Sequence, residues 1–232
     1  MLIDPPRELR GYPVRVRDLL VGERTYRVLG PANYESLVDD PRVAERFERE
    51  EFMPYWAEFW PACLLLADEV AKWPRVWRDL ASPPVVLEVG CGLGLVSLVA
   101  LDRGCRVIAS DWDDDALAFV CESARVSGLA SPETRFIDWR LKYPELRLDR
   151  LLAAEVLYET RSLRPVAEFI CEHLTETGEA LIVDGNRQTA DAFDSIARHC
   201  GLRVEVTPVE RPDPESGKPI RGRIFRLRRR LD

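Results

Sequence analysis

Residues 85–94 read VVLEVGCGLG: a short apolar run, the carboxylate of Glu88, and then glycines at positions 90, 92 and 94. The apolar stretch LVSLVAL follows directly, and a second apolar run, RVIASD, ends at Asp111. Glycine lacks a Cβ atom and tolerates positive φ, so a turn built from it can approach a ligand closely. This order predicts a strand, a tight turn, a helix and a second strand. In open α/β sheets, ligands bind beyond the carboxyl ends of such strands.

The spacing of the turn indicates the kind of ligand. Dinucleotide-binding folds prefer G-x-G-x-x-G, with the pyrophosphate at a helix N-terminus, whereas this turn reads E-x-G-x-G-x-G. Glu88 would repel a phosphate but can accept hydrogen bonds from a cationic ligand, and Asp111 can accept from both ribose hydroxyls. These features favour S-adenosylmethionine, which carries a sulfonium, an ammonium and a ribose. The alternative is a glycine-rich turn without a ligand. The preceding strand, the following helix and the acid that ends the next strand together favour nucleoside binding.

Composition and charge narrow the class of protein. The 232 residues carry a net charge of −7, which argues against a broad nucleic-acid interface. Six cysteines are scattered without a C-x-x-C pair or a His-Cys cluster, so a metal site has little support. The first residues, MLIDPPRELRG, contain no apolar signal region, and no segment reaches membrane-spanning length. We therefore expect a cytoplasmic protein with neither nucleic acid nor membrane as its partner. The sequence does not indicate an oligomeric state.

The stretch RGRIFRLRRR at residues 221–230 is basic, in contrast to the net negative charge of the chain. It has two interpretations: a patch for an acidic partner, or a final strand. The second is favoured, because Phe225 and Leu227 need burial while arginine side chains can extend to solvent.

The order of patterns along the chain predicts the architecture. Residues 12–29 alternate and break at Gly22, as in a β-hairpin. Residues 35–52 indicate loop and helix, and Trp60-Pro61 opens a helix that stops at Pro74. Strands are then expected at 85–89, 105–110, 134–137, 150–154 and 179–184, helices at 94–103, 114–126, 164–174 and 189–200, and a final strand pair at 202–208 and 221–228.

This alternation predicts an α/β fold, a Rossmann-like, doubly wound, seven-stranded sheet. One strand should be antiparallel, because the last two strands have no helix between them. The predicted division is an N-terminal extension, hairpin and loop, over residues 1–45, packed on a core domain over residues 46–232.

Two further strand ends carry candidate functional residues. Asp138-Trp139 ends the third strand, where a carboxylate can accept the adenine amino hydrogen and an indole can pack on the purine. The alternative there is a polar loop beside a core tryptophan. The fourth strand runs RLLAAEVLYE, and Glu155 stands where it exits, with Tyr158 three residues later. Small Ala154 allows close approach of a ligand.

Glu155 is expected to orient a nucleophilic amine and to stabilise its developing cation, with Tyr158 forming the wall of the transfer channel. In the alternative, Glu155 caps the strand or pairs with an arginine such as Arg161 or Arg187.

The motifs together resemble those of the class I, seven-β-strand S-adenosylmethionine-dependent methyltransferases. More narrowly, the chain is similar to the protein-lysine methyltransferase group that includes the electron-transfer-flavoprotein β-subunit lysine methyltransferase, also described as nicotinamide-methyltransferase-like. The resemblance covers residues 45–200 and includes the upstream MPYWAEFWPA stretch with Trp60. The chain departs from it at Ser123 and Ser127, where relatives often carry asparagine, and at Glu155, where most carry aspartate.

The resemblance implies an S-adenosylmethionine-dependent N-methyltransferase acting on a protein lysine, with S-adenosylhomocysteine as product. A small-molecule amine or pyridine N-methyltransferase shares every cofactor feature, and a non-catalytic scaffold that binds nucleosides or proteins is the alternative of another class. Glu155 and Tyr158 are the predicted catalytic residues. The predicted cofactor-binding residues are Trp60, Glu88, Gly90, Cys91, Gly92, Gly94, Asp111, Trp112, Asp138, Trp139 and Ala154.

Overall fold

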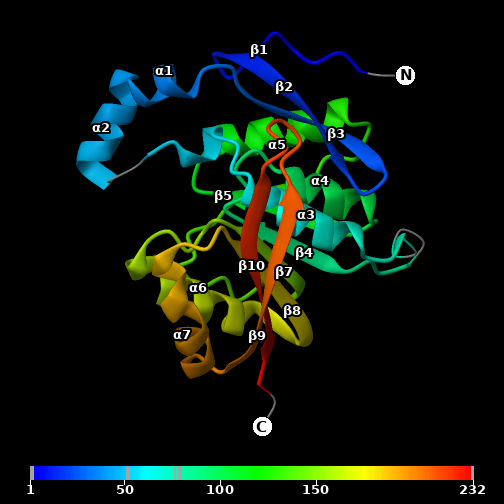
Figure 1. Ribbon diagram of the computed structural model, residues 1–232, viewed down its shortest axis with the longest axis vertical. Coiled ribbons are helices and arrows are strands. Elements are labelled where there is room, and N and C mark those ends of the chain that lie inside the picture. Colours follow the sequence, from blue (N-terminus) through cyan, green and yellow to red (C-terminus); the bar gives the residue numbers. More distant parts are fainter. Residues whose placement is uncertain (1–2, 51–52, 76, 78–79, 231–232) are drawn as a thin grey trace.

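Within residues 3–50, 53–75, 77 and 80–230, which the computed structural model describes, a seven-stranded sheet forms the centre of the protein (Figure 1). Its order is β6-β5-β4-β7-β8-β10-β9. β10 runs antiparallel to both of its neighbours, and the other neighbouring strands are parallel. This confirms the predicted doubly wound sheet with one reversed strand. The strands are β4 (Val85–Val89), β5 (Arg106–Asp111), β6 (Glu133–Phe136), β7 (Leu148–Ala154), β8 (Leu174–Asp184), β9 (Leu202–Pro212) and β10 (Pro219–Arg229).

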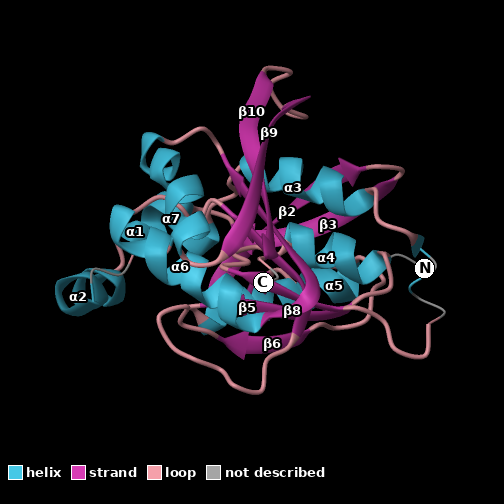
Figure 2. Cartoon of the chain, turned by 90° about the horizontal axis from the view of Figure 1, so that it is seen from below, coloured by secondary structure: helices cyan, strands magenta, loops and turns pink. Residues whose placement is uncertain are grey.

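Helices cover both faces of this sheet (Figure 2). On one face lie α3 (Ala62–Ala71), α4 (Leu95–Asp102) and α5 (Asp114–Val126), and on the other lie α6 (Thr160–His173) and α7 (Phe193–His199). The sequence of α4, LVSLVALD, is apolar almost all round, as expected of a helix enclosed by other elements. The last predicted helix is split, because a 3-10 helix, η3 (Gln188–Ala192), precedes α7.

The N-terminal segment adds a small antiparallel sheet of three strands among the described residues: β1 (Glu8–Leu9), β2 (Tyr12–Val21) and β3 (Arg24–Pro31). The predicted hairpin is therefore confirmed. Its helical continuation consists of α1 (Tyr34–Val38) and α2 (Pro41–Glu50). The last two residues of the predicted loop and helix, Glu51 and Phe52, lie outside the described residues.

β3 is fixed to α5 by the two serines that replace the asparagines of the resembled family. The Leu29 amide donates to Ser123 Oγ at 2.9 Å, and the Arg27 amide donates to Ser127 Oγ at 3.0 Å. Tyr26 of β3 is fully buried, and its hydroxyl donates to Asp102 Oδ2 on α4 at 3.2 Å. The serines therefore satisfy backbone donors at the edge of the small sheet, which would otherwise lose hydrogen bonds on burial.

The basic stretch at 221–230 forms β10, as the favoured interpretation predicted. Phe225 and Leu227 are buried in the core. Arg226 and Arg228 both bind the carboxylate of Glu179, at 2.7 and 2.6 Å. Much of the positive charge of this segment is therefore already matched within the chain. None of the described helices is both long and apolar enough to span a bilayer.

Candidate active site

The turn between β4 and α4 places backbone at the carboxyl edge of the sheet. Gly90 and Gly92 have φ values of +63° and +51°, which disfavour any other residue. A Cβ atom on Gly90 would lie 3.1 Å from Val156 Cγ1, and one on Gly92 would lie 3.4 Å from the Trp56 carbonyl oxygen. A side chain at either position would crowd these neighbours, so the close turn requires glycine at both.

Glu88 lies beneath this turn. Glu88 is only 2% exposed. Its Oε2 accepts hydrogen bonds from the Ser97 amide at 2.7 Å and from Ser97 Oγ at 2.5 Å. Burial raises the pKa of Glu88 to about 8, in spite of the bonds from Ser97. Glu88 therefore ties β4 to the first turn of α4.

Asp111 ends β5 beside the glycine turn. Its Oδ2 accepts from the Gly92 amide and its Oδ1 from the Trp112 amide, both at 2.8 Å. These bonds fix the orientation of the carboxylate but leave acceptor capacity on both oxygens, since an ionised carboxylate has about four lone-pair sites. Burial raises the pKa of Asp111 to about 6, against the effect of the backbone hydrogen bonds. Such a buried carboxylate gains from hydroxyl donors.

Asp138 and the two tryptophans form the next part of the site. The carboxylate of Asp138 forms a bidentate ion pair with the guanidinium of Arg140, and the shortest N–O distance is 2.8 Å. Burial alone would raise the pKa of Asp138, but the hydrogen bonds from Arg140 outweigh it and lower the pKa. The Arg140 guanidinium also lies 5.2 Å from the centroid of the Trp112 ring. Trp139 lies close to Gly90. Two indoles and an anchored carboxylate thus meet at one end of the glycine turn.

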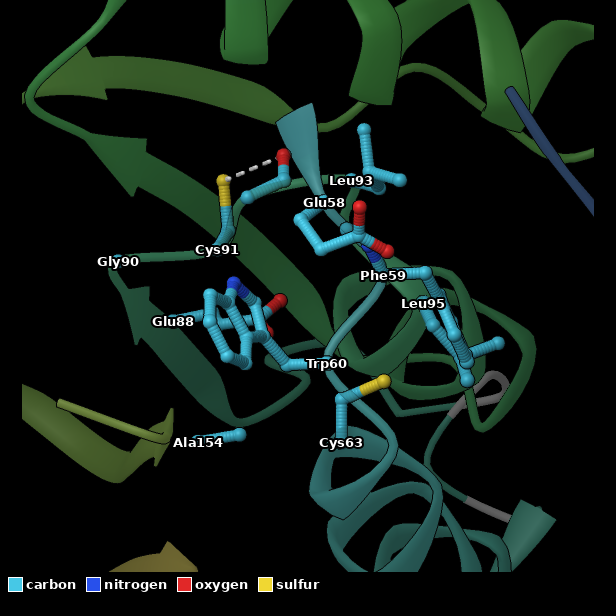
Figure 3. Close-up of a pocket in the computed structure, with 12 residues that line it drawn as sticks. Glu58, Phe59, Trp60, Cys63, Glu88, Gly90, Cys91, Leu93, Leu95 and Ala154 are labelled. Atoms are coloured by element: carbon cyan, nitrogen blue, oxygen red, sulfur yellow. Dashed lines mark hydrogen bonds between the residues drawn. The ribbon is translucent and has the colours of Figure 1, made fainter. Parts of the chain in front are cut away.

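A cavity of about 910 Å³ opens in front of these residues. It brings together most of the residues that the sequence predicted for the site: Trp60, Gly90, Gly92, Asp111, Trp112, Asp138, Trp139, Ala154, Glu155 and Tyr158. A small cavity of about 40 Å³ adjoins it, shown in Figure 3 with the Trp60 indole between the glycine turn and Ala154. Glu88, Cys91 and Gly94 line only the small cavity. Their predicted contact with the cofactor stays a prediction.

Glu155 follows the end of β7 in a strained conformation. Its φ is +60°, which is uncommon for a residue other than glycine and often marks functional sites. Its amide donates to the Val183 carbonyl at 2.9 Å, and its Oε2 accepts from Arg187 Nε at 2.7 Å. The side chain is 10% exposed. The pair with Arg187, an alternative left open by the sequence, is therefore present, and it lies inside the cavity.

Three aromatic rings line the same cavity as this carboxylate. Tyr55 lies 5.6 Å from Tyr158 and 6.2 Å from Trp60 between ring centroids, both in edge-to-face geometry. Trp60 Nε1 donates to the Tyr55 carbonyl at 2.9 Å, which fixes the indole. Burial raises the pKa of Tyr158 to about 12, so its hydroxyl stays protonated at neutral pH. The aromatic wall is therefore neutral, and its faces suit a cation.

Comparison with known proteins places the chain in a family. A family model described as lysine methyltransferase matches residues 57–196. The chain belongs to this family. Every part of the site described above except Tyr55 and Trp56 falls within the matched residues. The methyltransferase matches no curated protein sequence.

Solved structures show the same fold at low sequence identity. A ribosomal protein L11 methylase from Lactobacillus delbrueckii subsp. bulgaricus matches with a TM-score of 0.55 and 17% identity, over 73% of this chain and 79% of that one. A SAM-dependent methyltransferase from Methanosarcina mazei gives 0.56 and 14%, over 69% and 99%. A precorrin-6y C5,15-methyltransferase from Geobacter metallireducens gives 0.52 and 14%, over 67% and 84%. At these identities the likeness shows the class I methyltransferase fold alone.

The methyltransferase uses S-adenosylmethionine, and the residues present fit that cofactor. Asp111 has free acceptor capacity for ribose hydroxyls, Gly90 and Gly92 line the cavity with backbone, and Trp112 and Trp139 line it with indoles that can pack on a purine. Across the described ranges, no group of three or more His, Cys, Asp or Glu side chains could hold a metal ion.

Several cavity residues of the methyltransferase were not predicted from the sequence. Arg140 follows Asp138 by two residues, and Tyr55 and Trp56 belong to the MPYWAEFWPA stretch in which only Trp60 was singled out. Arg187 was named only as a partner of Glu155. The density of aromatic residues in this stretch could have indicated Tyr55 and Trp56 as site residues. Arg187 carried none, because its place depends on how β8 pairs with β7.

Proposed function

We propose that the protein is a protein-lysine N-methyltransferase in which Glu155 and Tyr158 receive the target amine. The observation that carries this proposal is the placement of Glu155: a carboxylate whose side chain is 10% exposed, in the cofactor cavity that Trp60, Tyr55 and Tyr158 also line. A charged side chain in such a place needs a cationic partner. Arg187 is that partner in the absence of substrate, and an amine brought to the carboxylate would compete with it. The description of the matched family supports lysine as the source of that amine.

S-adenosylmethionine, when bound, supplies an electrophilic methyl group. The chain has to align the amine, remove its proton and exclude water. A lysine ammonium has a pKa near 10.4 in water, and burial among Trp60, Tyr55 and Tyr158 lowers it, because burial disfavours the charged form. Glu155 then accepts a hydrogen bond from the neutral amine and stabilises the positive charge that grows on nitrogen during transfer.

The geometry favours an aliphatic amine over the other candidate substrates. A pyridine nitrogen carries no hydrogen to donate to Glu155, so the carboxylate could stabilise its growing positive charge but could not orient it through a hydrogen bond. The recessed position of Glu155 suits a slender, unbranched stem such as that of lysine. A non-catalytic scaffold would not require a strained glutamate, since a left-handed conformation costs about 1–3 kcal/mol.

The test is transfer of a labelled methyl group from S-adenosylmethionine into an extract of cells that lack the protein. We expect a labelled protein band, and we expect its acid hydrolysate to contain the label as methylated lysine. Glu155→Gln should lower kcat by about 10²–10³, the usual effect of removing a preorganised charged group. Its affinity for the cofactor, measured by calorimetry, should stay close to that of the wild type.

Glu159→Gln is the matched control. Glu159 lies on the same cavity rim but pairs with Arg161, and we expect this variant to keep its turnover. Label found only in the small-molecule fraction would support a metabolite amine as substrate. A stable Glu155→Gln protein with full turnover would remove Glu155 from the reaction.

A further inference from the structure

The guanidinium of Arg187 occupies the place that suits an incoming amine. Its Nε lies 2.7 Å from Glu155 Oε2, and its Cζ lies 5.5 Å from the centroid of the Trp60 ring. We call Trp60, Glu155 and Tyr158 the amine subsite. A carboxylate and an aromatic face are the two partners that recognise an ammonium group. In this structure both of those partners already contact a cation from the chain itself.

The backbone of Arg187 is held firmly. Its amide donates to Asp184 Oδ2 at 2.9 Å, and its carbonyl accepts from Arg223 Nη2 at 2.8 Å. Arg223 also binds Asp191 at 2.7 Å, and Asp184 is fully buried. The turn after β8 is thus fixed from two sides. Only the side chain of Arg187 has freedom to leave the subsite.

The side chains of the pair differ in exposure. Arg187 is 37% exposed and Glu155 is 10% exposed. Glu155 has a left-handed backbone, and its Oε1 lies packed against Gly185, where a Cβ atom would come within 2.8 Å of it. A move that breaks the pair therefore falls to Arg187, which can turn toward solvent while the carboxylate stays in the cavity.

From this geometry we infer that Arg187 is the resident cation of the amine subsite and that the target amine must displace it. This inference rests on the proposed function. Arg187 keeps Glu155 paired before substrate arrives, since an unpaired buried charge is costly. A free amine then gains little by entering, because it exchanges one cation for another. An amine on a larger body can draw on contacts elsewhere to drive the exchange. Arg187 therefore selects against small amines and for a lysine held by its surrounding polypeptide.

The test measures binding and needs no natural substrate. The probe is an analogue of the cofactor in which a tertiary amine replaces the sulfonium and carries an aminobutyl arm. Its matched partner carries a plain butyl arm. The measured quantity, by calorimetry on the full chain, is the amine preference, which is the Kd of the butyl probe divided by that of the aminobutyl probe.

For the wild type we expect an amine preference close to one. For Arg187→Met, which keeps an unbranched stem and removes the charge, we expect about tenfold or more, the combined worth of a partly exposed ion pair and a cation–π contact. Arg187→Lys keeps a cation and should stay close to one. Arg161→Met removes a second arginine at the cavity rim, paired with Glu159, and should also stay close to one.

The outcomes separate this inference from the proposed function. If the wild type already prefers the aminobutyl probe strongly and Arg187→Met leaves or weakens that preference, Arg187 is not a competing cation and only this inference fails. If no variant prefers the aminobutyl probe, the amine subsite itself is wrong and the proposed function fails with it. Arg187→Gln replaces Arg187→Met should the latter not fold.

Discussion

The third glycine of the turn offers the sharpest test of how the fold supports the site. Gly94 has a φ of +77°, and a Cβ atom there would lie 2.8 Å from Val120 Cγ1 on α5 and closer still to Cγ2. In Gly94→Ala, the left-handed conformation costs about 1–2 kcal/mol and the overpacking about 1–3 kcal/mol. The free energy of unfolding should therefore fall by about 2–5 kcal/mol, which lowers Tm on the order of 10 °C for a chain of this length.

Three further variants, Gly128→Ala, Val120→Ala and the double variant Gly94→Ala/Val120→Ala, divide this loss into its parts. Gly128 has a similar φ of +66°, but a Cβ atom there would meet nothing within 4 Å. Gly128→Ala should therefore show the conformational cost alone, about 1–2 kcal/mol. Val120→Ala, combined with Gly94→Ala, removes the two nearest of the three Val120 atoms that the new Cβ meets and leaves only Val120 Cβ, at 3.0 Å. The double variant should be more stable than the sum of the two single losses predicts.

The assay is urea unfolding of all four variants, together with calorimetry of S-adenosylmethionine binding. Equal losses for Gly94→Ala and Gly128→Ala would refute the packing argument. A folded Gly94→Ala protein with cofactor affinity reduced tenfold or more would show instead that this glycine faces the ligand, as the sequence alone predicted.

Two predictions concern buried carboxylates. Asp111→Ala should weaken S-adenosylmethionine binding by about 1.5–3 kcal/mol. In the wild type, binding should weaken as the pH falls through about 6, where Asp111 gains a proton. Calorimetry of Asp111→Asn should show no such pH dependence. Glu88 has a pKa raised from 4.5 to about 8, so the folded state holds the extra proton and its free energy of unfolding falls as pH rises across that window. Glu88→Gln should flatten the decline measured by urea unfolding from pH 5 to 8.5, and an unchanged slope would contradict the raised pKa.

The sequence predicts the fold well because its signals are local. The alternation of strands and helices, the glycine turn and the acids at strand ends each occupy a few consecutive residues. Parallel strands bring their carboxyl ends to one edge of the sheet, so Asp111, Asp138 and Glu155 were expected to meet, and all three line the cavity.

The parts that the sequence does not predict depend on side-chain packing between distant segments. The glycines of the turn look equivalent in sequence, yet Gly94 contacts Val120 while Gly90 faces the cavity. The pair between Glu155 and Arg187 joins residues that are 32 positions apart, through the pairing of β7 with β8. No local pattern specifies which of many arginines takes that place.

The position of β10 between β8 and β9 constrains the order in which the sheet can assemble. Among the described strands, β9 pairs with β10 alone, whereas β10 pairs with both neighbours. β9 therefore cannot join the sheet before β10. Arg223, which holds the carbonyl of Arg187, belongs to β10. The turn that carries Arg187 therefore has its full support only once β10 has paired with β8, so the amine subsite depends on a strand near the far end of the chain.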